Sequence, residues 1–262
     1  MLNLNYQKMG EGEPLIIAHG LFGSSLNWRS VANKLARHFC VINVDQRNHG
    51  DSPHAPEHNY AVMAEDLRDL MDHLGLEQAH ILGHSMGGKT GMVFASRWPE
   101  RLKSLMVVDI APRTYPPLHE NIFEALLAVD FSKVSNRQEV DEALAEYVEE
   151  PEVRQFLLTN LTRRHGRLDW KLNVRTLYAN YDALNAMPDL ENPYDGPALF
   201  IRGGNSDYVR ESDEAVIRDC CANACIKTFP NVQHWPHIEA PVAFLRAVID
   251  FGLDPRAVPC NF

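Results

Sequence analysis

Short apolar runs alternate with amphipathic stretches along most of the chain. The runs, such as PLIIA and LMVVD, are typical of strands that are buried on both faces of a parallel sheet. They predict strands at 14–18, 41–44, 79–82, 105–109, 198–201 and 224–229. Apolar residues at helical spacing predict helices at 27–39, 63–74, 89–98 and 242–251. We therefore expect an α/β fold with an open, mostly parallel sheet and helices on both of its faces.

The alternation breaks down between Pro112 and Pro197. Helical spacing predicts helices at 122–129, 140–149, 153–161 and 174–181, and no strong strand run is seen there. A segment of this length is too long to be a structureless loop in a compact domain. We expect a core made of residues 1–112 and 197–262, with a helical cap inserted at 113–196.

Composition and charge narrow the class of protein. Of 262 residues, 25 are Lys or Arg and 35 are Asp or Glu, so the net charge is −10, which argues against nucleic acid as a partner. The N-terminus lacks the pattern of a signal peptide, and no apolar run is long enough to cross a membrane. We therefore predict a cytoplasmic protein with no membrane span. The sequence does not indicate its oligomeric state.

The cysteines do not follow the spacing of a disulfide framework or a zinc ribbon. Their number is odd, and two of them are adjacent in the chain. We expect free thiols in a reducing compartment at all five positions: Cys40, Cys220, Cys221, Cys225 and Cys260.

A G-x-S-x-G element spans 83–87 and places Ser85 between a predicted strand and a predicted helix. A serine hydroxyl is a weak nucleophile until a base accepts its proton, so it must stand where base and substrate both reach it. Glycines on both sides permit the sharp turn that exposes the side chain. The strand, turn and helix around the motif make Ser85 the candidate nucleophile.

An oxyanion hole needs two backbone N–H donors. The N–H of Met86, at the start of the helix, is the first candidate. The loop after the first central strand, HGLFG, supplies the second, for which we favour Leu21 over Phe22. We expect His19, in the same loop, to be structural.

The general base should be a histidine late in the chain. His234 lies between the last predicted strand and the last helix, where a loop can hold an imidazole over Ser85. His237 is the competitor. Because it lies nearer to the helix, a polar role at the helix start suits it better.

Two aspartates could orient the base, and both keep the chain order Ser, Asp, His. In many members of the family that the motifs described below resemble, the acid lies three residues after a glycine that ends the late strand. Counting from Gly203 gives Ser206, so Asp207 lies one position too late. Asp109 ends a buried strand beside Ser85, where an unpaired carboxylate would be costly. We favour Asp109 and expect Asp45, with Arg47, to hold its own loop in place.

Several motifs together carry a family resemblance: HGLFGS, VDQRNHGDSP, GHSMGGK, VVDIAP, FIRGGNS and HWPHIEAP. Over essentially its whole length the chain resembles an α/β-hydrolase, and most closely the small bacterial serine esterases and their mitochondrial α/β-hydrolase-domain relatives. Two positions depart from the common pattern of the superfamily. Asn48 replaces a glycine, as in the esterase subgroup, and Gln233 replaces the usual glycine before His234.

The resemblance implies the α/β-hydrolase fold and a serine carboxylesterase that acts on small acyl esters or acyl thioesters without a metal or organic cofactor. A lactonase or a carbon–carbon bond hydrolase would keep the same triad, and a ligand receptor could retain it without turnover. Dehalogenases and epoxide hydrolases need an aspartate where Ser85 stands. In the cap, six apolar residues either line the acyl pocket or bury the core of the cap itself: Phe123, Leu126, Leu127, Phe156, Leu157 and Tyr181.

Overall fold

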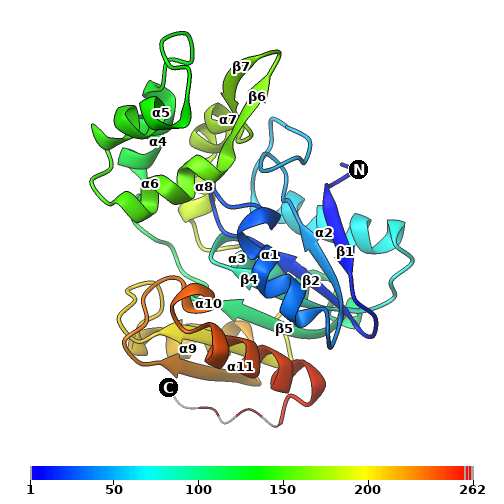
Figure 1. Cartoon of the computed structure of the whole chain (residues 1–262). Helices are drawn as coiled ribbons and strands as arrows, with labels where there is room; N and C mark the ends of the chain where they lie inside the picture. The colour runs from blue at the N-terminus through cyan, green and yellow to red at the C-terminus, as the bar shows by residue number, and fades with distance from the viewer. Residues whose placement is uncertain (1, 257, 259, 261–262) are drawn as a thin grey trace.

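A computed structural model describes residues 2–256, 258 and 260 of the chain, and its centre is a seven-stranded sheet (Figure 1). The strand order is β1-β3-β2-β4-β5-β8-β9, and every neighbouring pair is parallel except β1 with β3. The α/β class expected from the sequence is confirmed. The strands are β1 (Tyr6–Met9), β2 (Pro14–Ala18), β3 (Cys40–Val44), β4 (Ala79–His84), β5 (Leu102–Val108), β8 (Ala198–Gly203) and β9 (Ala224–Phe229).

Alternate side chains of each central strand enter different hydrophobic layers. In β2, Leu15 and Ile17 pack on one face and Ile16 packs on the other. The first layer is covered by α1 (Ser25–Leu35) and α11 (Pro241–Leu253). The second is covered by α2 (Tyr60–His73), α3 (Met86–Arg97) and α9 (Glu214–Cys220). Short helical turns lie between these elements: η1 (Pro99–Arg101), η3 (Glu211–Asp213) and α10 (Pro236–Glu239).

The segment predicted as a helical cap contains helices and also a β-hairpin. Figure 1 shows its elements together at the upper left, apart from the main sheet. They are α4 (Glu120–Ala128), α5 (Arg137–Ala145), α6 (Pro151–Leu157), η2 (Leu158–Asn160), β6 (Leu161–Arg164), β7 (Arg167–Trp170), α7 (Val174–Ala179) and α8 (Tyr181–Asn185). The division of the chain at 113 and 196 stays a prediction.

The expectation of no strand in the cap was wrong. β6 and β7 pair antiparallel across the two-residue turn His165–Gly166, and both turn residues have positive φ, at 49° and 82°. The first strand reads LTRR and carries two arginines. A hairpin of this kind leaves no apolar run in the sequence. The pattern of apolar residues therefore did not predict these two strands. The edge strand β1, which reads YQKM, was missed for the same reason.

The expectation of five free thiols was also wrong. Cys225, in β9, forms a disulfide with Cys260, which lies 35 residues later. Cys40, Cys220 and Cys221 are free and buried. The pairing needs Cys260 to lie beside the last strand, and cysteine spacing alone does not reveal that contact. None of the helices among the described residues has the length and apolar character needed to cross a membrane.

Candidate active site

Ser85 occupies a strained turn between β4 and α3. Its backbone has φ 50° and ψ −114°, a conformation that is rare for a residue with a side chain. The two glycines of the motif make this turn possible. A Cβ on Gly83 would lie 2.2 Å from the carbonyl oxygen of Gly87, and a Cβ on Gly87 would lie 2.1 Å from that of Ala18. The turn therefore needs glycine at both positions.

His234 and Asp109 are in direct contact. Nδ1 of His234 lies 2.8 Å from Oδ2 of Asp109. The other carboxylate oxygen of Asp109 accepts the N–H of Gly203 at 2.8 Å, and the aspartate side chain is completely buried. The Asp109 backbone has φ 51°, so the residue turns sharply as β5 ends. This contact fixes the proton of His234 on Nδ1 and leaves Nε2 to accept another.

The two rival residues, Asp207 and His237, have other partners. Asp207 is 90% exposed in its side chain and pairs with Arg210 at 3.4 Å. His237 belongs to α10, is buried, and stacks on Trp28 with ring centroids 4.2 Å apart. Burial, and then the charge of His234, lower the pKa of His237 to about 3. The structure thus brings His234 together with Asp109 and not with Asp207.

Two residues to which the sequence gave no role contact this pair, and a third contacts one of these two. Ser206 Oγ donates to Oδ2 of Asp109. The ring of Tyr208 stacks on the imidazole of His234 at 3.9 Å and 22°, and its hydroxyl lies 3.1 Å from Nε2 of His119. Burial lowers the pKa of His119 to about 4, so that side chain is neutral near pH 7. Ser206 stands where the counting from Gly203 placed an acid, so this position supplies a donor to the acid instead.

The loop after β2 passes directly over Ser85. A Cβ on Gly20 would lie 3.4 Å from Cβ of Ser85. The N–H of Phe22 donates to Nε2 of His49 at 3.3 Å, whereas the N–H of Leu21 makes no hydrogen bond with any residue that the structure describes. Met86 is the first residue of α3, so its N–H has no acceptor within the helix. Both N–H groups favoured from the sequence therefore remain available.

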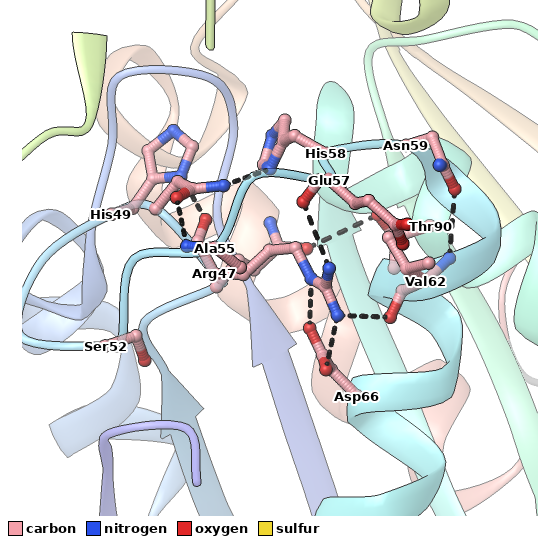
Figure 2. Close-up of polar contacts among 12 residues, drawn as sticks. Arg47, His49, Ser52, Ala55, Glu57, His58, Asn59, Val62, Asp66 and Thr90 are labelled. Atoms are coloured by element: carbon pink, nitrogen blue, oxygen red, sulfur yellow. Dashed lines mark hydrogen bonds and ion pairs between the residues drawn. The ribbon is translucent and has the colours of Figure 1, made fainter. Parts of the chain in front are cut away.

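Hydrogen bonds and an ion pair hold the polar loop 45–59 in place (Figure 2). Arg47 pairs with Asp66 of α2 through two contacts of 2.6 and 2.8 Å, as Figure 2 shows. Asp45 accepts the N–H groups of Ser25 and Asp51 at 2.6 and 2.9 Å. Asp45 and Arg47 thus both hold the loop, through different partners. Burial lowers the pKa of His49 well below its usual value, so the ring is neutral and Nε2 accepts from Phe22.

Asn48 explains one departure from the superfamily pattern. Its φ is 65°, a conformation for which glycine is the usual residue and which asparagine tolerates better than most. Its side-chain oxygen accepts the N–H of Ala55 at 2.9 Å and Nδ2 of Asn173 at 3.0 Å. The backbone N–H of Asn173 donates to the carbonyl of Asn48 at 3.0 Å. Asparagine here links the loop to the cap, which a glycine side chain could not do.

Two cavities open beside Ser85. The larger has a volume of about 290 Å³ and is lined mainly by apolar side chains, including Phe156 and Ile122 of the cap; His234 also lines it. The smaller has about 40 Å³ and reaches Tyr181. The sequence left open whether six apolar cap residues line the acyl pocket or bury the cap core. Of the four that remain, Phe123, Leu126 and Leu157 are buried and Leu127 is 43% exposed. Phe156 and Tyr181 thus line cavities, whereas Phe123, Leu126 and Leu157 fill the core.

The sequence and the fold match those of known proteins. A family model described as alpha/beta hydrolase fold matches residues 13–241. The sn-1-specific diacylglycerol lipase ABHD11 of Mus musculus is 43% identical over 245 residues, which cover 90% of this chain and 80% of the relative. Esterase YbfF of Escherichia coli (strain K12) is 36% identical over 243 residues, or 92% and 94% of the two chains. A solved marine microorganism esterase superposes with a TM-score of 0.93 at 40% identity and covers 96% of this chain and all of its own.

The chain belongs to the α/β hydrolase family. Within that family it is an enzyme of the group of esterases and lipases to which these relatives belong. The resemblance drawn from the sequence motifs is therefore confirmed.

Proposed function

We propose that the chain is a serine carboxylesterase that acts on small acyl esters through Ser85, His234 and Asp109. His234 accepts the proton of Ser85 while Oγ attacks the acyl carbonyl carbon. Asp109 holds the imidazole in the tautomer with its proton on Nδ1. The N–H groups of Leu21 and Met86 donate to the oxyanion of the tetrahedral intermediate.

The intermediate then collapses. His234 gives its new proton to the leaving alcohol oxygen as the carbon–oxygen bond breaks, and an acyl ester remains on Ser85. Water, deprotonated by His234, attacks this ester, the carboxylic acid leaves, and Ser85 recovers its proton. The steps need no metal and no organic cofactor. A thioester offers the same carbonyl carbon, so acyl thioesters remain predicted alternative substrates.

One observation carries this proposal: Asp109 meets Nδ1 of His234 at 2.8 Å, and His234 lines the same cavity as Ser85. An aspartate nucleophile of the dehalogenase type has no place here, because Ser85 occupies the turn. The predicted cytoplasmic location is a separate matter and stays a prediction. It loses one of its supports with the Cys225–Cys260 disulfide, since such bonds are rare in reducing compartments.

The test is covalent labelling combined with turnover. We expect the wild-type enzyme to hydrolyse 4-nitrophenyl acetate, and a fluorophosphonate to abolish that turnover and add its mass to the peptide that contains Ser85. The Ser212→Ala variant, which changes an exposed serine, is the control and should label fully. A label on another serine, or turnover that survives full labelling, would contradict the proposal.

A further inference from the structure

The two cavities beside Ser85 differ in which catalytic groups they reach. Four residues line both cavities: Leu21, Ser85, His119 and Tyr208. His234 lines only the larger cavity, and Met86 lines only the smaller. The junction between the cavities is therefore at the candidate nucleophile, with the base on one side and an oxyanion donor on the other.

This difference between the cavities indicates which one would hold the alcohol half of an ester and which the acyl half. The leaving oxygen must receive its proton from His234, so the alcohol has to lie on the side of that imidazole. The larger, mainly apolar cavity thus takes the alcohol. The acyl chain extends the other way, into the smaller cavity beside Met86. This assignment rests on the proposed function.

The side chain of Lys89, which is buried, lines the smaller cavity. Lys89 lies four residues after Ser85 on α3, which places it one turn further along the same side of the helix, and only 1% of its surface is exposed. Its Nζ donates to the carbonyl oxygens of Ala186 and Asn185 at 2.7 and 3.2 Å, and lies 3.5 Å from that of Leu184. The ring centroid of Tyr115 lies 4.8 Å from Nζ.

No carboxylate balances this charge. Among the described residues, Lys89 forms no ion pair, and the cavity lining contains no Asp or Glu. Arg113 lies over the same Tyr115 ring at 4.0 Å, and it pairs with Asp213 at 3.1 Å. Burial, and then Arg113, lower the pKa of Lys89 to about 7. Backbone carbonyls satisfy the N–H groups but bring no net negative charge, and a buried charge without a partner is costly.

We propose that the smaller cavity is an acyl subsite for a short chain that ends in a carboxylate, and that Lys89 pairs with this carboxylate. A volume of about 40 Å³ has room for roughly three water-sized groups, which suits a succinyl-sized chain and not a long fatty acyl chain. Tyr60 and Tyr115 also line this cavity, and their hydroxyls donate to the backbone carbonyls of Leu184 and Tyr208 at 2.6 and 2.5 Å. The substrate class is then a monoester of a short dicarboxylic acid with an apolar alcohol.

Lys89 could instead only anchor the cap, because its acceptors lie at the end of α8. The two roles predict different kinetics. An anchor affects the hydrolysis of all esters alike, whereas a carboxylate partner affects only esters with an anionic acyl chain.

The experiment compares two esters of nearly the same shape, benzyl hydrogen succinate and benzyl 4-methylpentanoate, by release of benzyl alcohol at pH 6. We expect the wild-type kcat/KM to be at least about tenfold higher for the succinate. Lys89→Met should lower the ratio of the two values by about tenfold to a hundredfold. The control Lys103→Met, which removes a surface lysine paired with Glu13, should leave the ratio unchanged.

Equal loss for both esters in Lys89→Met would overturn the proposal and leave Lys89 as an anchor of the cap. A wild-type enzyme without preference for the succinate would overturn it too, and this result needs no variant to fold. If the proposed esterase function itself is wrong, the experiment gives a different result. In that case neither ester is hydrolysed and the fluorophosphonate does not label Ser85.

Discussion

Asp109 illustrates how a single residue combines strain, burial and hydrogen bonding. Its positive φ turns the side chain out of the line of β5 and towards His234, and its carboxylate is held by Gly203, Ser206 and the imidazole. An aspartate so deeply buried is stable only because donors surround both of its oxygens. Its place in the site thus follows from the loops after β5 and β8 together.

The identity of the acid is tested by two matched variants. Asp109→Asn should lower kcat by roughly 10⁴, because the amide favours the wrong tautomer of His234. Asp207→Asn should cost less than about tenfold, because that side chain is exposed and pairs with Arg210. Both variants are compared with the same ester after their folding has been checked by circular dichroism. The reverse ranking would move the acid to Asp207.

Tyr208 gives a second prediction at this scale. Its ring lies face to face with His234, where an aromatic face stabilises the imidazolium that forms as Ser85 attacks. Tyr208→Leu should therefore lower kcat by about threefold to thirtyfold. Tyr208→Phe keeps the ring, loses only the contact with His119, and should recover most of the activity. If the Phe and Leu variants are equally impaired, the stacking does not contribute.

At the scale of elements, α4 contributes to both the cap core and the larger cavity. Ile122 lines the cavity, whereas Leu127 of the same helix is exposed. Ile122→Trp should fill part of the cavity and reduce kcat/KM for benzyl acetate by about tenfold, with methyl acetate little affected. Leu127→Trp is the control and should change neither value. Equal effects on both esters would show that the cap does not select substrates through this cavity.

The elements that the sequence predicted well share one physical property. β2, β4, β5 and β8 are buried on both faces, so each contains a short run of apolar residues, and this run marks the strand. The hairpin β6–β7 derives its pairing from the turn at His165–Gly166 and carries few apolar residues. Edge and surface pairings of this kind depend on neighbours that a local pattern does not contain.

In the candidate site, too, some residues could be predicted from the sequence and others could not. Ser85, Asp109 and His234 lie at the ends of strands or in the loops that follow them, where residue type and spacing already restrict the chemistry. Tyr208 and His119 carry no motif. Tyr208 stacks on His234, and His119 reaches Tyr208, only because the cap and the loop after β8 come together beside the site. Contacts of that kind could not be predicted without the structure.

Several histidines are buried in their neutral form. They make the stability of the whole molecule depend on pH. Burial lowers the pKa of His58 and His237 to about 3 and that of His119 to about 4, below the unfolded value of about 6.5. Below about pH 6.5 the unfolded chain binds protons that the folded chain does not. The free energy of unfolding should therefore fall with pH from about 6.5 downwards, by up to about 1.4 kcal/mol per pH unit for each histidine.

Urea unfolding at several pH values between 7 and 4.5 measures this slope. His237→Gln should make it shallower by about 1.4 kcal/mol per pH unit at the acid end of the range. His73→Gln, at an exposed position, is the control and should keep the wild-type slope. An unchanged slope in His237→Gln would mean that this imidazole is protonated in the folded state.

The account depends most on Ser85 as the nucleophile of an ester hydrolase. The most direct measurement is the turnover number of Ser85→Ala on 4-nitrophenyl acetate, with the folding of the variant checked by thermal unfolding. Loss of a triad nucleophile costs on the order of 10⁶ in kcat in a comparable enzyme, and we expect a loss of that order here, with the melting temperature nearly unchanged. A folded Ser85→Ala variant that retained even about a tenth of the wild-type turnover would contradict the account.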